Sequence, residues 1–152
     1  CFLFINFQLN KYFYRIYNMI ILLYSSLFSY MLFFSVCIAP IITSILDKKN
    51  SSKLLRKIFP RNFIYGLIIS LLLIISSFFL ENKTSFIISI IIFLFFIINL
   101  FILIPKINSE ADKSINKKKY SSKFKALHLY SVLLYLIQIL LSFSMLIKEI
   151  II

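Results

Sequence analysis

Four long runs of apolar residues, separated by short polar segments, dominate the pattern along the chain. The runs cover residues 19–46, 62–80, 85–104 and 124–147, close to or above the roughly 20 residues that an α-helix needs to cross a bilayer. No segment of strand length alternates strictly between apolar and polar residues, and the single glycine disfavours β-hairpins. The pattern predicts an all-α integral membrane protein, an antiparallel four-helix bundle.

Composition and charge agree with this prediction. Hydrophobic residues make up 61% of the 152 positions, far more than a soluble domain carries. The net charge of +12 comes from 17 Lys and Arg against 5 Asp and Glu, a balance that can indicate nucleic-acid binding. Here the charges lie mainly between the apolar runs, as in membrane proteins. We therefore expect anionic lipid headgroups, and no nucleic acid, as partners of the basic loops.

The two ends of the chain lie outside the predicted bundle of residues 19–147. Residues 1–18 read CFLFINFQLNKYFYRIYN, where polar residues interrupt the apolar pattern. We interpret them as a leader, disordered or lying in the interface, because the small-residue cleavage pattern of a signal peptide is missing. Met19, directly before the first long run, is a candidate true start. Residues 148–152 are expected to form a C-terminal tail.

Positive charge gathers in two of the connecting segments. Residues 47–60 read DKKNSSKLLRKIFP, which favours either a short helix in the headgroup layer or a plain basic loop. Residues 106–123 carry six lysines, whereas the turn at 81–84 holds one Lys and one Glu. The positive-inside rule therefore predicts cytoplasmic basic loops and both termini on the opposite side. The abundance of lysine, isoleucine and asparagine suggests a bacterial host, and hence the cytoplasmic (inner) membrane.

The last run contains a row of polar residues that starts at the one histidine of the chain. At steps of three and four residues the row comprises His128, Ser131, Tyr135, Gln138, Ser142 and Met145. These positions fall within an arc of about 100° on one helix face, and the other faces are almost wholly Leu, Ile, Val and Phe. A membrane helix of this kind turns its polar face toward other protein.

Polar or kinked positions of all four runs are predicted to lie at one level. At a rise of about 1.5 Å per residue, they fall in the cytoplasmic third of the membrane. The predicted intramembrane polar cluster comprises Pro40, Thr43, Asn62, Tyr65, Asn99, His128, Ser131, Tyr135 and Gln138. Each member also has a purely structural interpretation, such as a hydrogen bond between helices for His128 or a kink for Pro40.

Motifs for catalysis or metal binding are weak. One histidine cannot provide bis-histidine haem ligation or a zinc site within one chain. The soft side chains suited to Cu(I) are Cys37, Met31, Met145 and His128, but no pair has ligand spacing. No nucleophile–base pair, phosphate-binding glycine loop or Asp or Glu within a run occurs. We expect no enzyme and no cofactor, with haem or copper on His128 as the alternative.

Four fragments, in this order, resemble a known family. They read APIITSILD (39–47), KIFPRNF (57–63), NLFILIPKI (99–107) and FKALHLYS (124–131). They are similar to the transmembrane protein 205-like family of four-helix membrane proteins, whose bacterial members carry a domain of unknown function. The matching positions are Pro40, Phe59, Pro60, Asn99, Pro105, Leu127, His128 and Ser131, whereas Leu129 departs from the small residue often found there.

The resemblance implies a fold but no settled reaction. The eukaryotic member is associated with platinum-drug resistance and vesicle trafficking. The family is distantly similar to copper-resistance D-type and haem-binding four-helix proteins, whose multiple histidines this chain lacks.

Three functional hypotheses remain open. The first is a non-enzymatic multi-pass membrane protein, able to form a homo-oligomer, that handles a small solute or metal species through the polar cluster. The second is a haem or copper redox protein that uses His128, shared across a homodimer. The third is a structural or assembly subunit of a membrane complex.

Overall fold

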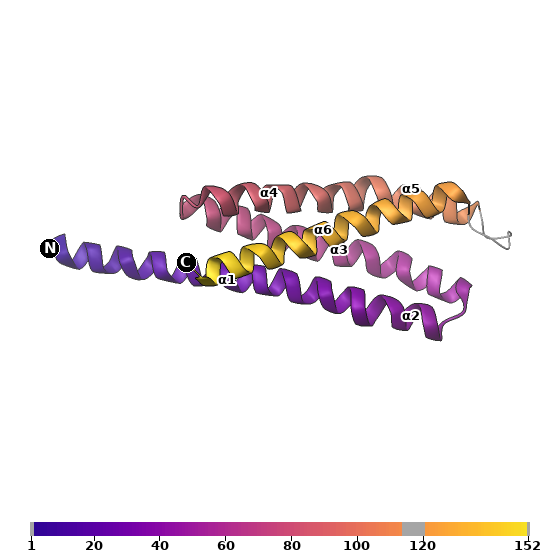
Figure 1. The fold of residues 1–152 in the computed structure, drawn as a ribbon, viewed down its shortest axis with the longest axis horizontal. Helices are drawn as coiled ribbons and strands as arrows, with labels where there is room; N and C mark the ends of the chain where they lie inside the picture. Colours follow the sequence, from indigo (N-terminus) through magenta and orange to yellow (C-terminus); the bar gives the residue numbers. More distant parts are fainter. Residues whose placement is uncertain (1, 114–120, 152) are drawn as a thin grey trace.

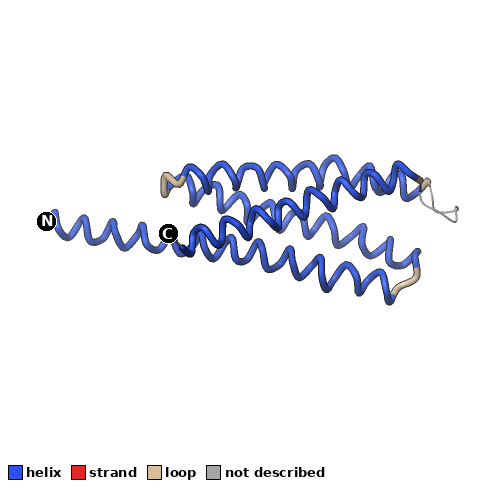
Figure 2. Tube along the Cα trace, viewed as in Figure 1, coloured by secondary structure: helices blue, strands red, loops and turns tan. Residues whose placement is uncertain are grey.

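The computed structural model of the protein describes residues 2–113 and 121–151, with side chains described from residue 18 onward except that of Lys48. In this part of the chain, four long helices pack in antiparallel order and no strand occurs (Figures 1 and 2). All four are long and apolar enough to cross a membrane. The all-α four-helix membrane bundle predicted from the apolar runs is thereby confirmed.

Two of the four spans are interrupted by a π-helix. The first span consists of α1 (Phe2–Phe33), η1 (Phe34–Ile38) and α2 (Ala39–Ile45). The second is the single helix α3 (Lys48–Phe79), and the third consists of α4 (Lys83–Ile97), η2 (Ile98–Leu103) and α5 (Ile104–Asp112). The fourth is α6 (Ser122–Ile151).

Each π-helix ends two residues before a proline. In η1 the amide of Ala39 donates to the carbonyl of Phe34, five residues back, and Pro40 follows. In η2 the amide of Ile104 donates to the carbonyl of Asn99, and Pro105 follows. A proline ring crowds the preceding turn and lacks an amide hydrogen, and a wide turn accommodates both effects without ending the helix. The kink predicted at Pro40 therefore takes the form of a π-helical turn.

The helices are longer than the apolar runs suggested. The basic segment 47–60 is continuous with the second span, because α3 passes through Pro60. The third span likewise continues through Pro105 to Asp112, and residues 114–120 of the second basic loop lie outside the described residues. The helix α6 includes most of the expected tail, and α1 begins at Phe2, within the expected leader. Lysine and arginine are good helix formers, and the carboxylate of Asp47 caps α3 by accepting from the amide of Asn50.

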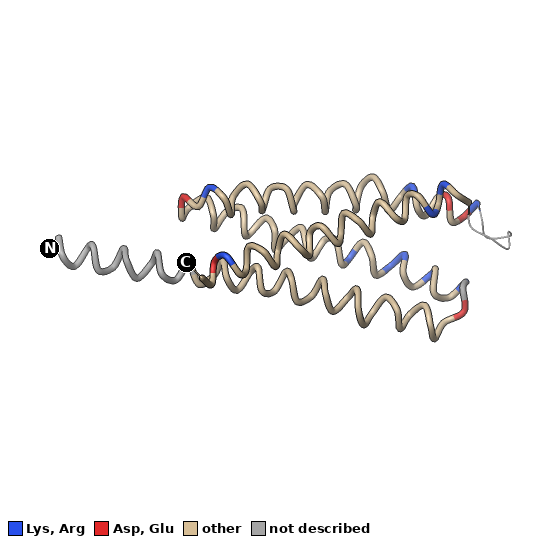
Figure 3. Tube along the Cα trace, viewed as in Figure 1, with Lys and Arg blue, Asp and Glu red and all other residues tan. Residues whose placement is uncertain are grey.

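The two ends of the bundle differ in charge (Figure 3). We call the end with the α2–α3 connection, the end of α5 and the start of α6 the basic end, because Lys and Arg gather there. The opposite end, with the α3–α4 turn and the end of α6, is called the turn end. Only 28–39% of the most apolar window of each span is buried inside the bundle, so most of the apolar surface faces outward, as expected of lipid-facing helices.

Candidate functional site

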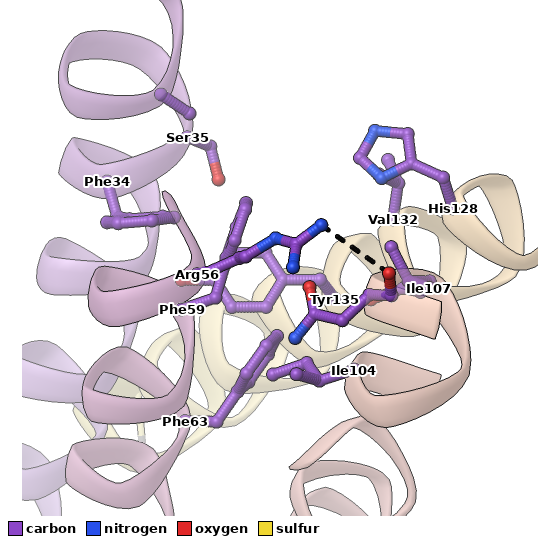
Figure 4. Close-up of a pocket in the computed structure, with 13 residues that line it drawn as sticks. Phe34, Ser35, Arg56, Phe59, Phe63, Ile104, Ile107, His128, Val132 and Tyr135 are labelled. Carbon is purple, nitrogen blue, oxygen red and sulfur yellow. Dashed lines mark hydrogen bonds between the residues drawn. The ribbon is translucent and has the colours of Figure 1, made fainter. Parts of the chain in front are cut away.

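A cavity of about 240 Å³ lies between the four spans, in the half of the bundle nearer the basic end (Figure 4). Every span contributes to its wall. The apolar lining residues are Phe34, Ala39, Phe59, Phe63, Ile104, Ile107 and Val132. The lining residues with polar groups are Ser35, Arg56, Asn108, His128, Ser131 and Tyr135. A mostly apolar wall with a few polar groups is typical of small-molecule sites.

Four aromatic side chains give the cavity its shape. The rings of Phe34 and Phe59 meet edge-to-face with centroids 5.5 Å apart, and those of Phe63 and Tyr135 do so at 5.7 Å. Phe34, Phe63 and Tyr135 are buried, so they form a fixed inner wall. Edge-to-face pairs of this kind add about 0.5–1.5 kcal/mol beyond the burial of their area.

Two hydrogen bonds between spans hold the polar groups of the inner wall. The Nδ2 atom of Asn62 donates to the hydroxyl of Tyr135 at 3.1 Å. The hydroxyl of Ser131 donates to Oδ1 of Asn99 at 2.6 Å. Asn99 is fully buried, and its Nδ2 has no hydrogen-bond partner among the described residues. The bonds fix α6 against α3 and η2 at the level of the cavity.

Arg56 crosses the cavity at its basic end and joins α3 to α5. Its Nη2 lies 2.6 Å from Oδ1 of Asp112. The same nitrogen donates to the carbonyl of Asn108 at 3.5 Å, the dashed line in Figure 4. The guanidinium thus closes the cavity toward the basic end while its own stem forms part of the wall.

His128 lies at the rim of the cavity. Its side chain is exposed, and its ring stacks on that of Phe124 with centroids 6.0 Å apart and planes 7° apart. Within the described residues it takes part in no hydrogen bond to a neighbouring span. The other five positions of the polar face of α6 are buried, so His128 alone departs from the inward placement expected of that face.

The remaining members of the predicted cluster lie in different places. Gln138 is fully buried, and its Nε2 donates to the carbonyl of Ile92 at 3.0 Å, deeper in the bundle. Pro40 and Thr43 are exposed, and the Thr43 hydroxyl bonds to carbonyls of its own helix. Tyr65 is exposed and meets Tyr30 edge-to-face. The structure therefore brings Asn62, Asn99, Ser131 and Tyr135 together, with His128 at the rim, and leaves the other four outside the cavity.

Sequence reasoning missed Arg56 and Asn108. Arg56 lies in the segment 47–60, interpreted as a short helix in the headgroup layer or a basic loop, and Asn108 lies in the second basic loop, so both fall outside the predicted spans. A usable signal exists, because Arg56, Phe59 and Phe63 follow one another at steps of three and four, the spacing of one helix face.

A second polar cluster lies at the turn end. The Tyr24 hydroxyl lies 3.0 Å from the hydroxyl oxygens of both Ser85 and Ser89. Nearby, Nδ2 of Asn82 donates at 2.9 Å to Oε1 of Glu149, which is only 2% exposed. The buried carboxylate was not expected, because residues 148–152 were interpreted as a tail. These hydrogen bonds join α1, α4 and α6 at this end.

The described residues offer few metal ligands at the cavity. No group of three or more His, Cys, Asp or Glu among them could hold a metal ion. His128 is the single imidazole at the cavity, and no sulfur atom lines it. Met31 and Met145 are buried in the hydrophobic core instead.

Comparison with known protein families relates the first three spans to a described family. The model of a family described as Domain of unknown function (DUF4149) matches residues 22–116. That range includes Arg56 and the cavity walls from the first three spans, whereas α6 lies outside it. No curated protein and no solved structure matches the chain.

Proposed function

The chain belongs to the DUF4149 family, a domain of unknown function, and we propose that it binds a small solute in the cavity between its four spans. One observation carries the proposal. All four spans converge on a cavity with an aromatic inner wall, and hydrogen bonds between helices hold its polar groups in place. Pockets with this balance of apolar wall and few fixed polar groups are the usual form of small-ligand sites.

Two further features support a binding role for this cavity. The π-helix η1 supplies Phe34 and Ser35 to the wall, and η2 ends directly before Ile104. Single π-helical turns inside α-helices are frequent at functional sites. Each of the four fragments similar to the transmembrane protein 205-like family also contributes a lining residue, among them Ala39, Phe59, Ile104 and His128. We include a relationship to that family in the proposal.

The location and orientation belong to the same proposal. The positive charge of the basic end supports a cytoplasmic position for it, with the turn end on the other side of a bacterial inner membrane. The cavity then lies in the cytoplasmic leaflet.

Site-resolved photolabelling tests the proposal. Protein in nanodiscs is irradiated with a diazirine analogue of decan-1-ol, and the labelled residues are mapped by mass spectrometry. We expect saturable labelling of cavity residues that excess decan-1-ol suppresses. The variant Ala39→Phe, which fills the cavity from the wall beside η1, should abolish it. The matched control Leu140→Phe changes an exposed residue and should leave it intact. Labelling that is uniform along the lipid-facing surface and equal in both variants would reject the cavity as a binding site.

A further inference from the structure

We propose that the ligand of this cavity is a small amphipathic acid that enters from the bilayer, and that Arg56 binds its acid group in place of Asp112. The inference rests on the proposed function and names the class of its ligand. Four observations lead to it: where the cavity opens, what its walls consist of, what Arg56 contacts, and how charge is distributed around it.

The cavity opens sideways, toward lipid. At the basic end the spans separate into two pairs, α2 with α3 and α5 with α6 (Figure 1). In the described part of the chain, no Cα atom of α2 lies within 8 Å of a Cα atom of α5 or α6. The wall residues on the α6 side of this gap, His128 and Val132, are exposed, and Ala39 on the α2 side is half-buried. The Arg56–Asp112 pair crosses the basic end, so the lateral gap is the approach that this ion pair leaves open.

The walls inside the gap suit an apolar body. The rings of Phe34, Phe59 and Phe63 line the space, so its wall suits a hydrocarbon or aryl group. A ligand that reaches the cavity from the bilayer must also partition into lipid. Both conditions select a molecule with a hydrocarbon or aryl portion.

Arg56 selects the other end of that molecule. A guanidinium presents a planar fork of donors that matches a carboxylate or a phosphate in two parallel hydrogen bonds. In the structure its partner is Asp112, and the two side chains are 31% and 53% exposed. Ion pairs at such exposure contribute little to stability, so a ligand acid can displace Asp112 at small cost.

The surrounding charge favours an anion over a cation or a neutral group. The described acidic side chains at the basic end are Asp47, Glu110 and Asp112. The described basic ones are Lys49, Lys53, Arg56, Lys57, Arg61, Lys106, Lys113, Lys123 and Lys125. Their summed positive potential raises the local concentration of anions at the mouth of the cavity.

The test compares matched ligands in nanodiscs of zwitterionic lipid. The probes are diazirine analogues of decanoate and decan-1-ol, which differ only in the head group. Arg56→Gln should weaken saturable labelling by the acid about tenfold or more, the loss expected of charge-assisted hydrogen bonds. Asp112→Asn should strengthen it, because the competitor for the guanidinium is removed. The control Lys53→Gln, on the same helix but outside this cavity, should change little. Lys53→Gln should leave labelling by the alcohol unchanged, and Arg56→Gln should weaken labelling by the acid much more than labelling by the alcohol.

The possible outcomes separate the two proposals. If acid and alcohol label equally and respond alike to Arg56→Gln, the cavity remains a site but the acid class is wrong. If neither probe labels saturably, the proposed function fails as well. If Asp112→Asn weakens acid labelling as Arg56→Gln does, the ion pair is structural and the displacement is refuted. Butyrate, which stays in water, should not compete; competition at the same free concentration as decanoate would refute access from the bilayer.

Discussion

Gly66 of α3 packs directly against the ring of Phe96 in α4. A Cβ atom built at position 66 would overlap ring atoms of Phe96 and also the hydroxyl of Tyr30 in α1. Three spans therefore come close together because this position has no side chain, as at other small-residue contacts between membrane helices. The contact lies within the buried core that adjoins the cavity, since Phe96 packs on Phe63.

Gly66→Ala should lower the stability of the bundle. Alanine is the better helix former by about 1 kcal/mol, but a methyl group forced into a filled core costs about 1–3 kcal/mol. We expect a net loss, measured as a lower midpoint of thermal unfolding in detergent micelles. The added Phe96→Leu change should restore part of it, because the ring that meets the new methyl group is removed.

The matched control is Ile68→Ala, two residues along the same helix at an exposed position. It should change the free energy of unfolding by no more than about 0.5 kcal/mol. A Gly66→Ala variant as stable as the wild type would show that the three spans can separate there without loss.

The fold was predictable because the chemistry of a bilayer leaves few alternatives. Apolar runs of span length must form helices, and short connections must join antiparallel neighbours. Sequence spacing alone fixes which side chains share a helix face. Five positions of the polar face of α6 are buried together as predicted, namely Ser131, Tyr135, Gln138, Ser142 and Met145.

The site was predictable only in part, because sequence spacing sets a face but not the register between helices. The hydrogen bonds from Asn62 to Tyr135 and from Ser131 to Asn99 depend on how far α3 and η2 are shifted along their axes relative to α6. The predicted second span starts after Pro60 and the predicted third span ends before Pro105, although a helix can continue past a proline. Arg56, the residue on which the ligand proposal depends, therefore falls outside the predicted spans.

The bond between Ser131 and Asn99 should show energetic coupling. Ser131→Ala leaves the buried Asn99 amide without its one hydrogen bond, which should destabilise the bundle by about 1–2 kcal/mol. In an Asn99→Leu background the same change should have little effect, because no buried polar group is left unpaired. A double-mutant cycle in thermal or denaturant unfolding measures the difference.

His128→Ala provides the control on the same helix, one turn away. Because His128 is exposed and contacts mainly Phe124, we expect a change within about 0.5 kcal/mol. Equal losses for Ser131→Ala and His128→Ala, or additive effects in the cycle, would contradict the hydrogen-bond assignment.

Asn82→Asp should destabilise the turn end although aspartate caps helices as well as asparagine. The Asn82 side chain has two roles, since Oδ1 accepts from the amide of Ser85 and Nδ2 donates to Glu149. Aspartate keeps the first role but replaces the donor with a second carboxylate beside a buried one, an unfavourable like-charge contact. We expect a lower midpoint of thermal unfolding at neutral pH.

The double variant Asn82→Asp with Glu149→Gln should recover part of this stability, because the glutamine amide can donate to the new carboxylate. A single variant as stable as the wild type would show that the Asn82–Glu149 bond is unimportant.

The orientation of the bundle can be read from labelling of single cysteines. In a background without Cys1 and Cys37, Lys83→Cys places an exposed thiol at the turn end, and Lys49→Cys and Lys125→Cys place thiols at the basic end. A membrane-impermeant maleimide added to sealed bacterial spheroplasts should label Lys83→Cys and leave the other two unlabelled until lysis, because positive loops remain in the cytoplasm. The reverse pattern would invert the orientation and move the cavity to the outer leaflet. Labelling of all three before lysis would be incompatible with spans that cross a sealed membrane.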